Sequence, residues 1–103
     1  MSRPRYYWYG FVQKTVRRYP DKLKQTGTIQ SSIAAFAIEK AITEIKSQPE
    51  GAEKLRLIEL LYWQKDFFYS LDQAADMMFI SPRLAQKWNS EFIYTVAKHM
   101  GYL

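Results

Sequence analysis

The spacing of apolar residues along the chain predicts a succession of helices. Apolar side chains recur at intervals of three and four residues, which is the period of one helix face. These stretches cover residues 5–19, 29–47, 52–65, 71–78 and 82–99. No stretch alternates apolar and polar residues as a half-buried strand does, and no Asn-Gly pair marks a hairpin. We therefore expect one all-α domain of about five helices joined by short connections.

The first two segments differ in how widely their apolar residues are spread. Pro20 ends the first helix, and Thr28 is placed to cap the second. The run "IAAFAIEKAITEI" in the second helix is apolar over a wide arc, so we expect a central helix with neighbours on more than one side. In the first helix the face expected inside comprises Trp8, Phe11, Val12, Val16 and Tyr19, and the opposite face comprises Lys14, Arg17 and Arg18.

The stretch "YSLDQAADMMFISPRLAQKW" predicts two helices separated by a tight break. Ser70 and Gln73 have the spacing of a capping box, and Ser81 is followed by Pro82 at the first helical position. The third helix before them, 52–65, buries a stripe formed by Leu55, Leu57, Ile58, Leu61 and Tyr62.

The same stretch has the spacing of a helix-turn-helix, a motif with two short helices and a tight turn. Ala75 is a small residue at the point where the second helix must approach the first, and Ile80 fills the turn. Ala85 and Trp88 lie on the side of the second helix that faces the first helix. Phe79 stands where glycine is usual, and a side chain there opposes a positive φ. A sigma-like or otherwise modified turn can avoid that conformation, whereas an ordinary helical hairpin would explain the spacing without DNA.

Helical geometry divides the segment 82–99 into two faces. Leu84, Ala85, Trp88, Phe92 and Val96 lie on the apolar arc, and Arg83, Gln86, Lys87, Ser90 and Tyr94 lie on the opposite arc. Arg and Lys suit the acceptors of guanine, and Gln suits adenine. Ser81 and the N–H groups of the helix start can hold a phosphate. We therefore expect residues 52–99 to bind DNA and residues 5–50 to support or oligomerise them.

Charge is concentrated at the start of the chain. The net charge is +5 and the pI about 9.5, and residues 1–27, 28–69 and 70–103 contribute +6, −1 and 0. Basic segments favour nucleic acid or anionic lipid, although they also form solvated faces. Lys14, Arg17 and Arg18, with Lys22 nearby, are candidates for contacts with the DNA backbone.

The aromatic run "YYWYGF" at residues 6–11 suggests either base stacking or packing. Helical spacing favours packing, with Trp8 and Phe11 inside and Tyr6 and Tyr7 nearer the basic side. Part of this run can close a homodimer, because a short domain has little core for so many aromatic residues.

The remaining composition argues against an enzyme. There is no Cys and one histidine, His99, without partners at metal-ligand or proton-transfer spacing, and the four glycines form no phosphate loop. Glu91 is isolated as well. We expect no cofactor and no metal. The chain lacks a long apolar run and an apolar leader, which indicates a cytoplasmic protein without a membrane partner.

Several of these segments resemble a known family. The segment "LRLIELLYWQKDFFYSLDQAADMMFISPRLAQKWNSEF" resembles the region-four helix-turn-helix of sigma factors. The whole chain, including "YYWYGFVQKTVRRYPDKL" and "WNSEFIYTVAKHMGYL", resembles phage late-transcription regulators of the RinA and ArpU type. The resemblance implies an activator of phage late genes in a bacterial host, with a recognition helix that starts at Ser81. It also implies that Arg83, Gln86 and Lys87 face DNA, and it allows a contact with host RNA polymerase.

Two other functions remain open at this point. A phage small terminase subunit also uses a helix-turn-helix, but it marks DNA for packaging and forms rings. A protein-interaction module would dock a partner on the last helix and would show no salt-dependent DNA affinity. One recognition helix covers only a few base pairs, so the DNA-binding hypothesis predicts a homo-oligomer, with a dimer favoured.

Overall fold

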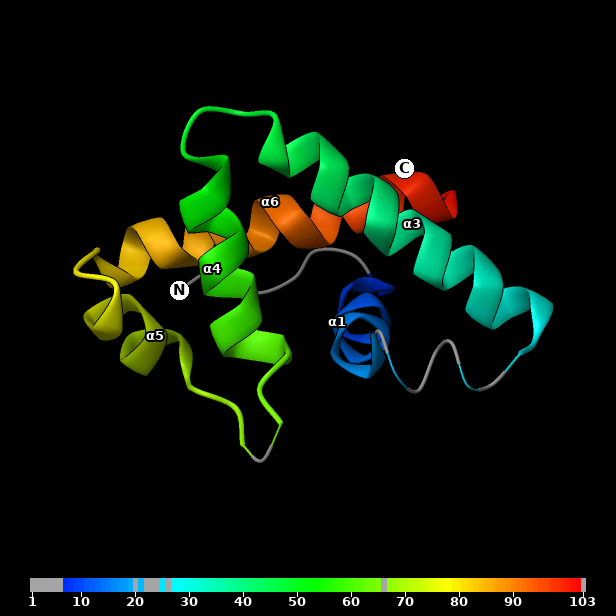
Figure 1. Ribbon diagram of the computed structural model, residues 1–103, viewed down its shortest axis with the longest axis horizontal. Coiled ribbons are helices and arrows are strands. Elements are labelled where there is room, and N and C mark those ends of the chain that lie inside the picture. Colours follow the sequence, from blue (N-terminus) through cyan, green and yellow to red (C-terminus); the bar gives the residue numbers. More distant parts are fainter. Residues whose placement is uncertain (1–6, 20, 22–24, 26, 66, 103) are drawn as a thin grey trace. The chain divides into compact units, whose positions relative to one another are not determined.

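The computed structural model describes residues 7–19, 21, 25, 27–65 and 67–102, and within them it contains five helices and no strand (Figure 1). This confirms the all-α prediction, and the helix boundaries lie within a few residues of those expected. The helices are α1 (Tyr9–Arg18), α3 (Ile29–Lys46), α4 (Gly51–Tyr62), α5 (Leu71–Met77) and α6 (Pro82–Met100).

The chain forms two compact units, and the two longest helices contribute to both. Unit 1 comprises Met1–Ala41 and Ile93–Leu103, and unit 2 comprises Ile42–Phe92. The second half of α6 therefore belongs to the same unit as α1, whereas the sequence-based division had assigned residues 52–99 to a single DNA-binding part. α6 is one continuous helix from Pro82 to Met100, so it has no break near Asn89.

In unit 1, α1 buries the face that its apolar spacing predicts. Trp8, Val12 and Val16 are buried, and Tyr19 is half-buried with its hydroxyl donating to Glu39 Oε2 at 3.3 Å. Phe11 was expected inside but is 55% exposed, and its ring meets that of Tyr102 edge-on at 6.4 Å. The rest of the unit 1 core consists of Tyr9 from α1, Ala34, Ala35, Ala37, Ile38 and Ala41 from α3, and Ile93, Val96 and Ala97 from α6.

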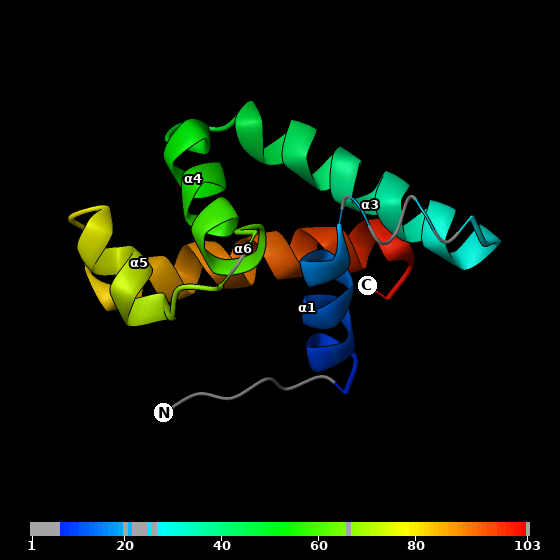
Figure 2. The ribbon, with the colours of Figure 1, turned by 60° about the horizontal axis from the view of Figure 1, so that its bottom comes forward.

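The helix α3 begins at a cap that the sequence predicts. Thr28 Oγ1 accepts the backbone N–H of Ser31 at 3.0 Å, which satisfies a donor of the first turn. Figure 2 shows α3 as one uninterrupted helix. Its apolar arc is only partly covered, because Ile29, Ile33 and Phe36 remain exposed while the alanines between them are buried. The prediction of a helix enclosed on more than one side is therefore wrong for this stripe.

In unit 2, α4 provides the largest share of the core. Leu57, Ile58, Leu60, Leu61 and Tyr62 are all buried, which confirms the predicted stripe apart from Leu55, which is half-buried. The other buried apolar residues of this unit are Ile45, Ala74, Ala75, Ala85, Trp88 and Phe92.

The turn before α4 requires a glycine at one position. A Cβ on Gly51 would collide with the carbonyl oxygen of Ile45 and would lie 2.7 Å from that of Lys46. The preceding residue, Glu50, has the left-handed φ of 62°. The backbones at the end of α3 and the start of α4 therefore approach so closely that no larger residue fits at position 51.

Candidate nucleic-acid interface

Helix α5 has only seven residues, and its first turn is held by a complete capping box. The backbone N–H of Gln73 donates to Ser70 Oγ at 3.1 Å, and the backbone N–H of Ser70 donates to Gln73 Oε1 at 2.9 Å. Both bonds satisfy donors that a helix start would otherwise leave unpaired. This confirms the predicted cap and explains how so short a helix keeps a defined start.

The turn after α5 is closed by two backbone hydrogen bonds. The N–H of Phe79 donates to the carbonyl of Asp76 at 3.2 Å, and the N–H of Ile80 donates to the carbonyl of Ala75 at 3.0 Å. This pair of bonds is the Schellman arrangement, which needs a left-handed residue just after the helix. Phe79 is that residue, with φ 59°. Of the two turns that the sequence left open, the chain therefore adopts the one with a positive φ.

The side chain of Phe79 is not buried in this left-handed conformation. Its side chain is 96% exposed, whereas the neighbouring Ile80 is half-buried, as expected for a residue that fills the turn. A left-handed residue with a Cβ costs about 1–2 kcal/mol relative to a right-handed one. The two backbone bonds and the packing of Ile80 evidently outweigh that cost.

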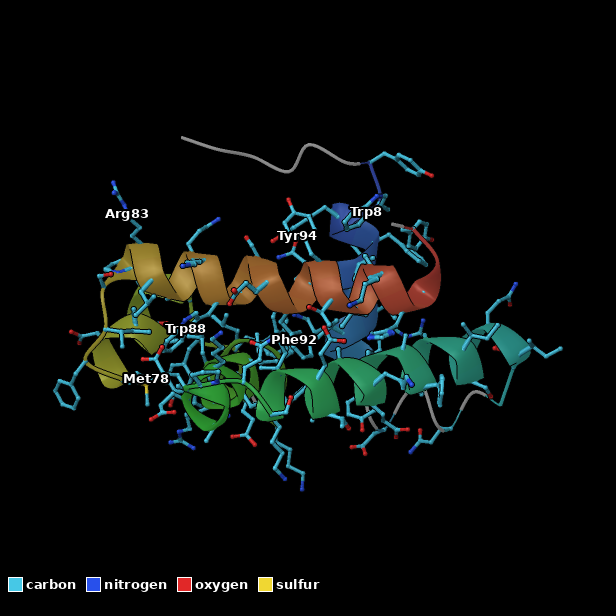
Figure 3. All side chains as sticks on the ribbon, turned by 90° about the horizontal axis from the view of Figure 1, so that it is seen from above. Trp8, Met78, Arg83, Trp88, Phe92 and Tyr94 are labelled. Atoms are coloured by element: carbon cyan, nitrogen blue, oxygen red, sulfur yellow. The ribbon has the colours of Figure 1, made fainter. Side chains whose placement is uncertain are left out.

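Helix α6 starts as the sequence predicts. Ser81 Oγ accepts the backbone N–H of Leu84 at 3.1 Å, and Pro82 occupies the first helical position. Ala85 and Trp88 are buried on the side that faces the core of unit 2, and Figure 3 shows Trp88 and Phe92 on one side of α6 and Arg83 on the other. Figure 2 shows α5, the turn and the start of α6 following one another.

The opposite side of α6 presents polar side chains to solvent. Arg83, Gln86 and Lys87 are exposed, and Ser90, one turn further on, is half-buried. Among the described residues, none gives the side chains of Arg83, Gln86 or Lys87 a hydrogen bond or an ion pair. We call Arg83, Gln86 and Lys87 the polar face of α6. Two basic side chains and an amide are thus available there to a ligand.

Two polar contacts with α4 fix how α6 is rotated, and the sequence did not reveal them. The hydroxyl of Tyr62 donates to Oδ1 of the buried Asn89 at 2.7 Å. The ammonium of Lys54 lies 3.3 Å from Oε1 of Glu91, so the description of Glu91 as isolated is wrong. The rings of Trp63 and Phe92 also meet edge-on at 6.0 Å. The one sequence signal was Asn89, a polar residue on the apolar arc of the helix.

Tyr94 departs from the arc on which the sequence placed it. It belongs to unit 1 and is half-buried, and its ring meets those of Trp8 and Tyr9 edge-on at 5.8 Å each. Figure 3 shows it further along α6 than Arg83. Its ring is engaged in the aromatic packing of unit 1, and we leave it out of the polar face.

The basic residues of α1 are exposed, as expected. Lys14, Arg17 and Arg18 all lie on the solvent side of this helix in unit 1, and Lys22 lies outside the described residues. Tyr7 is 93% exposed, and Tyr6 also lies outside the described residues.

The described residues contain no group of three or more acidic or histidine side chains that could hold a metal ion. Within the same part of the chain, no helix is both long and apolar enough to cross a membrane. Comparison with protein-family models, with curated proteins and with solved structures found no match to this chain.

Proposed function

We propose that this protein binds double-stranded DNA through a helix-turn-helix formed by α5 and α6, and that it is a sequence-specific transcription regulator. The observation on which this depends is the polar face of α6. Arg83, Gln86 and Lys87 are exposed and unpaired within the described chain, while the other side of the same helix is buried. Such a face has no evident role in the stability of unit 2.

The position of these residues suits a helix that enters the major groove. They lie in the first two turns of α6, the end that recognition helices place against base edges. Arg83 and Lys87 can donate to N7 and O6 of guanine, and Gln86 can both donate to and accept from adenine. Ser81 already accepts the N–H of Leu84, but its own hydroxyl proton remains able to donate to a phosphate.

The charge of the chain supports the same function. Its net charge of +5 would attract the phosphate backbone and make the affinity fall with salt. Lys14, Arg17 and Arg18 are exposed on α1 and would add affinity without sequence information if they also reach the backbone.

The resemblance to phage late-transcription regulators makes activation of phage late genes the more specific form of this proposal. In that form the protein also contacts host RNA polymerase. A small terminase-like packaging subunit and a protein-interaction module are the alternatives, and the oligomeric state and the salt-dependent DNA affinity distinguish them.

The experiment is a fluorescence-anisotropy titration of a pool of random-sequence duplexes at several salt concentrations. For the site that the wild type selects, the double variant Arg83→Ala/Lys87→Ala should lose at least about 30-fold in affinity, since it removes two pairings with base edges of about 1–3 kcal/mol each. Its salt slope should also become shallower by roughly one for each phosphate that the variant no longer neutralises. Selection of bound duplexes by the wild type should enrich a short site, and the variant should enrich none.

The matched control removes the same charge elsewhere in unit 2. Lys46 and Lys65 are exposed, so Lys46→Ala/Lys65→Ala changes the net charge equally while the polar face of α6 stays intact. This control should keep the selected site, and circular dichroism should show that all three proteins are folded. Absence of any DNA affinity at low salt, or equal losses in both double variants, would refute the proposed interface.

A further inference from the structure

The exposed side of α3 in unit 1 bears a stripe of large apolar residues. Ile29 is 79% exposed, Ile33 50% and Phe36 62%. Their intervals of four and three residues place them on one face of the helix, and Ser32 is exposed beside them. We call Ile29, Ser32, Ile33 and Phe36 the α3 stripe. An exposed apolar patch of this kind marks a surface that a partner covers.

The charge around the α3 stripe restricts which partner can cover it. Residues 28–38 contain no charged side chain, although the chain as a whole has a net charge of +5. Nucleic acid and anionic lipid would need several cations at this surface, but residues 28–38 supply none, and the nearest cation along α3 is Lys40 at the edge of the α3 stripe. Two copies of a basic chain repel each other at most faces, but here they can approach without bringing two cations together.

We propose that the α3 stripe is the interface with a second copy of this chain. The two α3 helices pack antiparallel about a two-fold axis that passes beside Ser32 and Ile33. This arrangement places Ile29 of one copy opposite Phe36 of the other and Ser32 opposite Ile33, so the two Ile33 side chains lie on either side of the axis. The small Ser32 lets the helix backbones come close at the crossing point. The pattern is self-complementary, as a two-fold interface requires. This inference does not depend on the proposed DNA binding.

The area of the α3 stripe indicates a weak dimer. Taking roughly 200 Å² for a fully exposed large apolar side chain, the three exposed fractions leave about 400 Å² per copy. A standard interface buries about 800 Å² per partner, so the polar rim must supply the other half. Lys40, whose ammonium lies 5.6 Å from the centre of the Phe36 ring, belongs to that rim. A Kd on the order of 10 µM is expected for such an interface.

The first test is sedimentation velocity over a concentration series. The wild type should pass from monomer to dimer, and Ile33→Glu should weaken the dimer at least ~30-fold, because it would place two unpaired carboxylates at the axis. Ile33 is half exposed, so the variant should stay folded, which circular dichroism can check. The control is Phe79→Gly, which removes an aromatic side chain of unit 2 that is more exposed than Ile33. This variant should leave the affinity of the dimer unchanged.

The second test uses the absence of cysteine from the chain. Under mild oxidation Ser32→Cys should form a disulfide between two copies, because residue 32 lies at the axis. Lys40→Cys should not, since a rise of 1.5 Å per residue separates its two copies by about 22 Å in the antiparallel pair, and a disulfide requires Cα atoms within about 7 Å.

Four results would overturn the proposal. The first is a wild type that stays monomeric up to about 300 µM, well above the expected Kd, and the second is assembly into rings larger than a dimer. The third is an Ile33→Glu dimer as strong as that of Phe79→Gly, which would place the interface elsewhere. Efficient cross-linking of Lys40→Cys is the fourth, because only a parallel pair brings both positions together.

Discussion

Replacing Phe79 with glycine should make this protein more stable, although it removes a large apolar side chain. Phe79 has φ 59° and is 96% exposed, so its ring contributes almost no burial to unit 2. Glycine adopts a left-handed conformation without the cost of about 1–2 kcal/mol that a Cβ imposes. Its greater freedom in the unfolded chain opposes this gain by about 0.5–1 kcal/mol. The expected net stabilisation is therefore about 0.5–1 kcal/mol.

The assay is thermal and urea unfolding followed by circular dichroism. For a domain of this size, 1 kcal/mol corresponds to a change in Tm of roughly 4–8 °C, so Phe79→Gly should raise Tm by about 2–8 °C. Phe79→Ala is the matched control, because it removes the ring but keeps the Cβ and its cost in the left-handed region. Alanine should leave Tm close to that of the wild type. If the glycine variant is no more stable than the alanine variant, the left-handed turn after α5 is not the conformation of this chain.

The remaining predictions concern the stability of unit 2. Gly51→Ala should lower the free energy of unfolding by about 1–3 kcal/mol, because its Cβ would meet the carbonyl oxygens of Ile45 and Lys46 at the start of α4. The matched control is Ala52→Ser at an exposed position in the same turn of α4, and urea unfolding measures both variants. Tyr62→Phe should cost about 1–3 kcal/mol, because it leaves the buried Oδ1 of Asn89 without its donor at 2.7 Å. A Tm unchanged in Tyr62→Phe would show that this bond does not hold α6 to α4.

The local features of this fold were predictable, because they depend on residues close in sequence. The caps at Thr28, Ser70 and Ser81 each need one side chain within reach of a backbone N–H three residues later. The buried arc of α6 follows from the helical period alone. Such interactions can be found in a single sequence without any knowledge of how the helices pack.

The features that could not be predicted involve residues far apart or partners outside the chain. The Tyr62–Asn89 bond joins positions 27 residues apart, and periodicity cannot pair them. The sequence did not predict that Ile33 and Phe36 are exposed. An apolar arc indicates that a surface is covered, but it does not distinguish a helix of the same chain from a separate partner. For Phe79 the sequence left open a turn with a positive φ and a turn without one. The free-energy cost of a left-handed residue with a Cβ is comparable with the stabilisation that one backbone hydrogen bond contributes.

The polar face of α6 and the α3 stripe lie in different units, so each can be tested without disturbing the other. A recognition helix covers only a few base pairs, and a DNA-binding function therefore benefits from a second copy. Ile33→Glu removes the second copy and leaves Arg83 and Lys87 in place. Arg83→Ala/Lys87→Ala removes the two cations and leaves the α3 stripe intact. If Ile33→Glu gives a monomer that still binds duplex DNA with reduced affinity, both proposals stand. A dimer that never binds DNA would retain the interface and refute the proposed function alone.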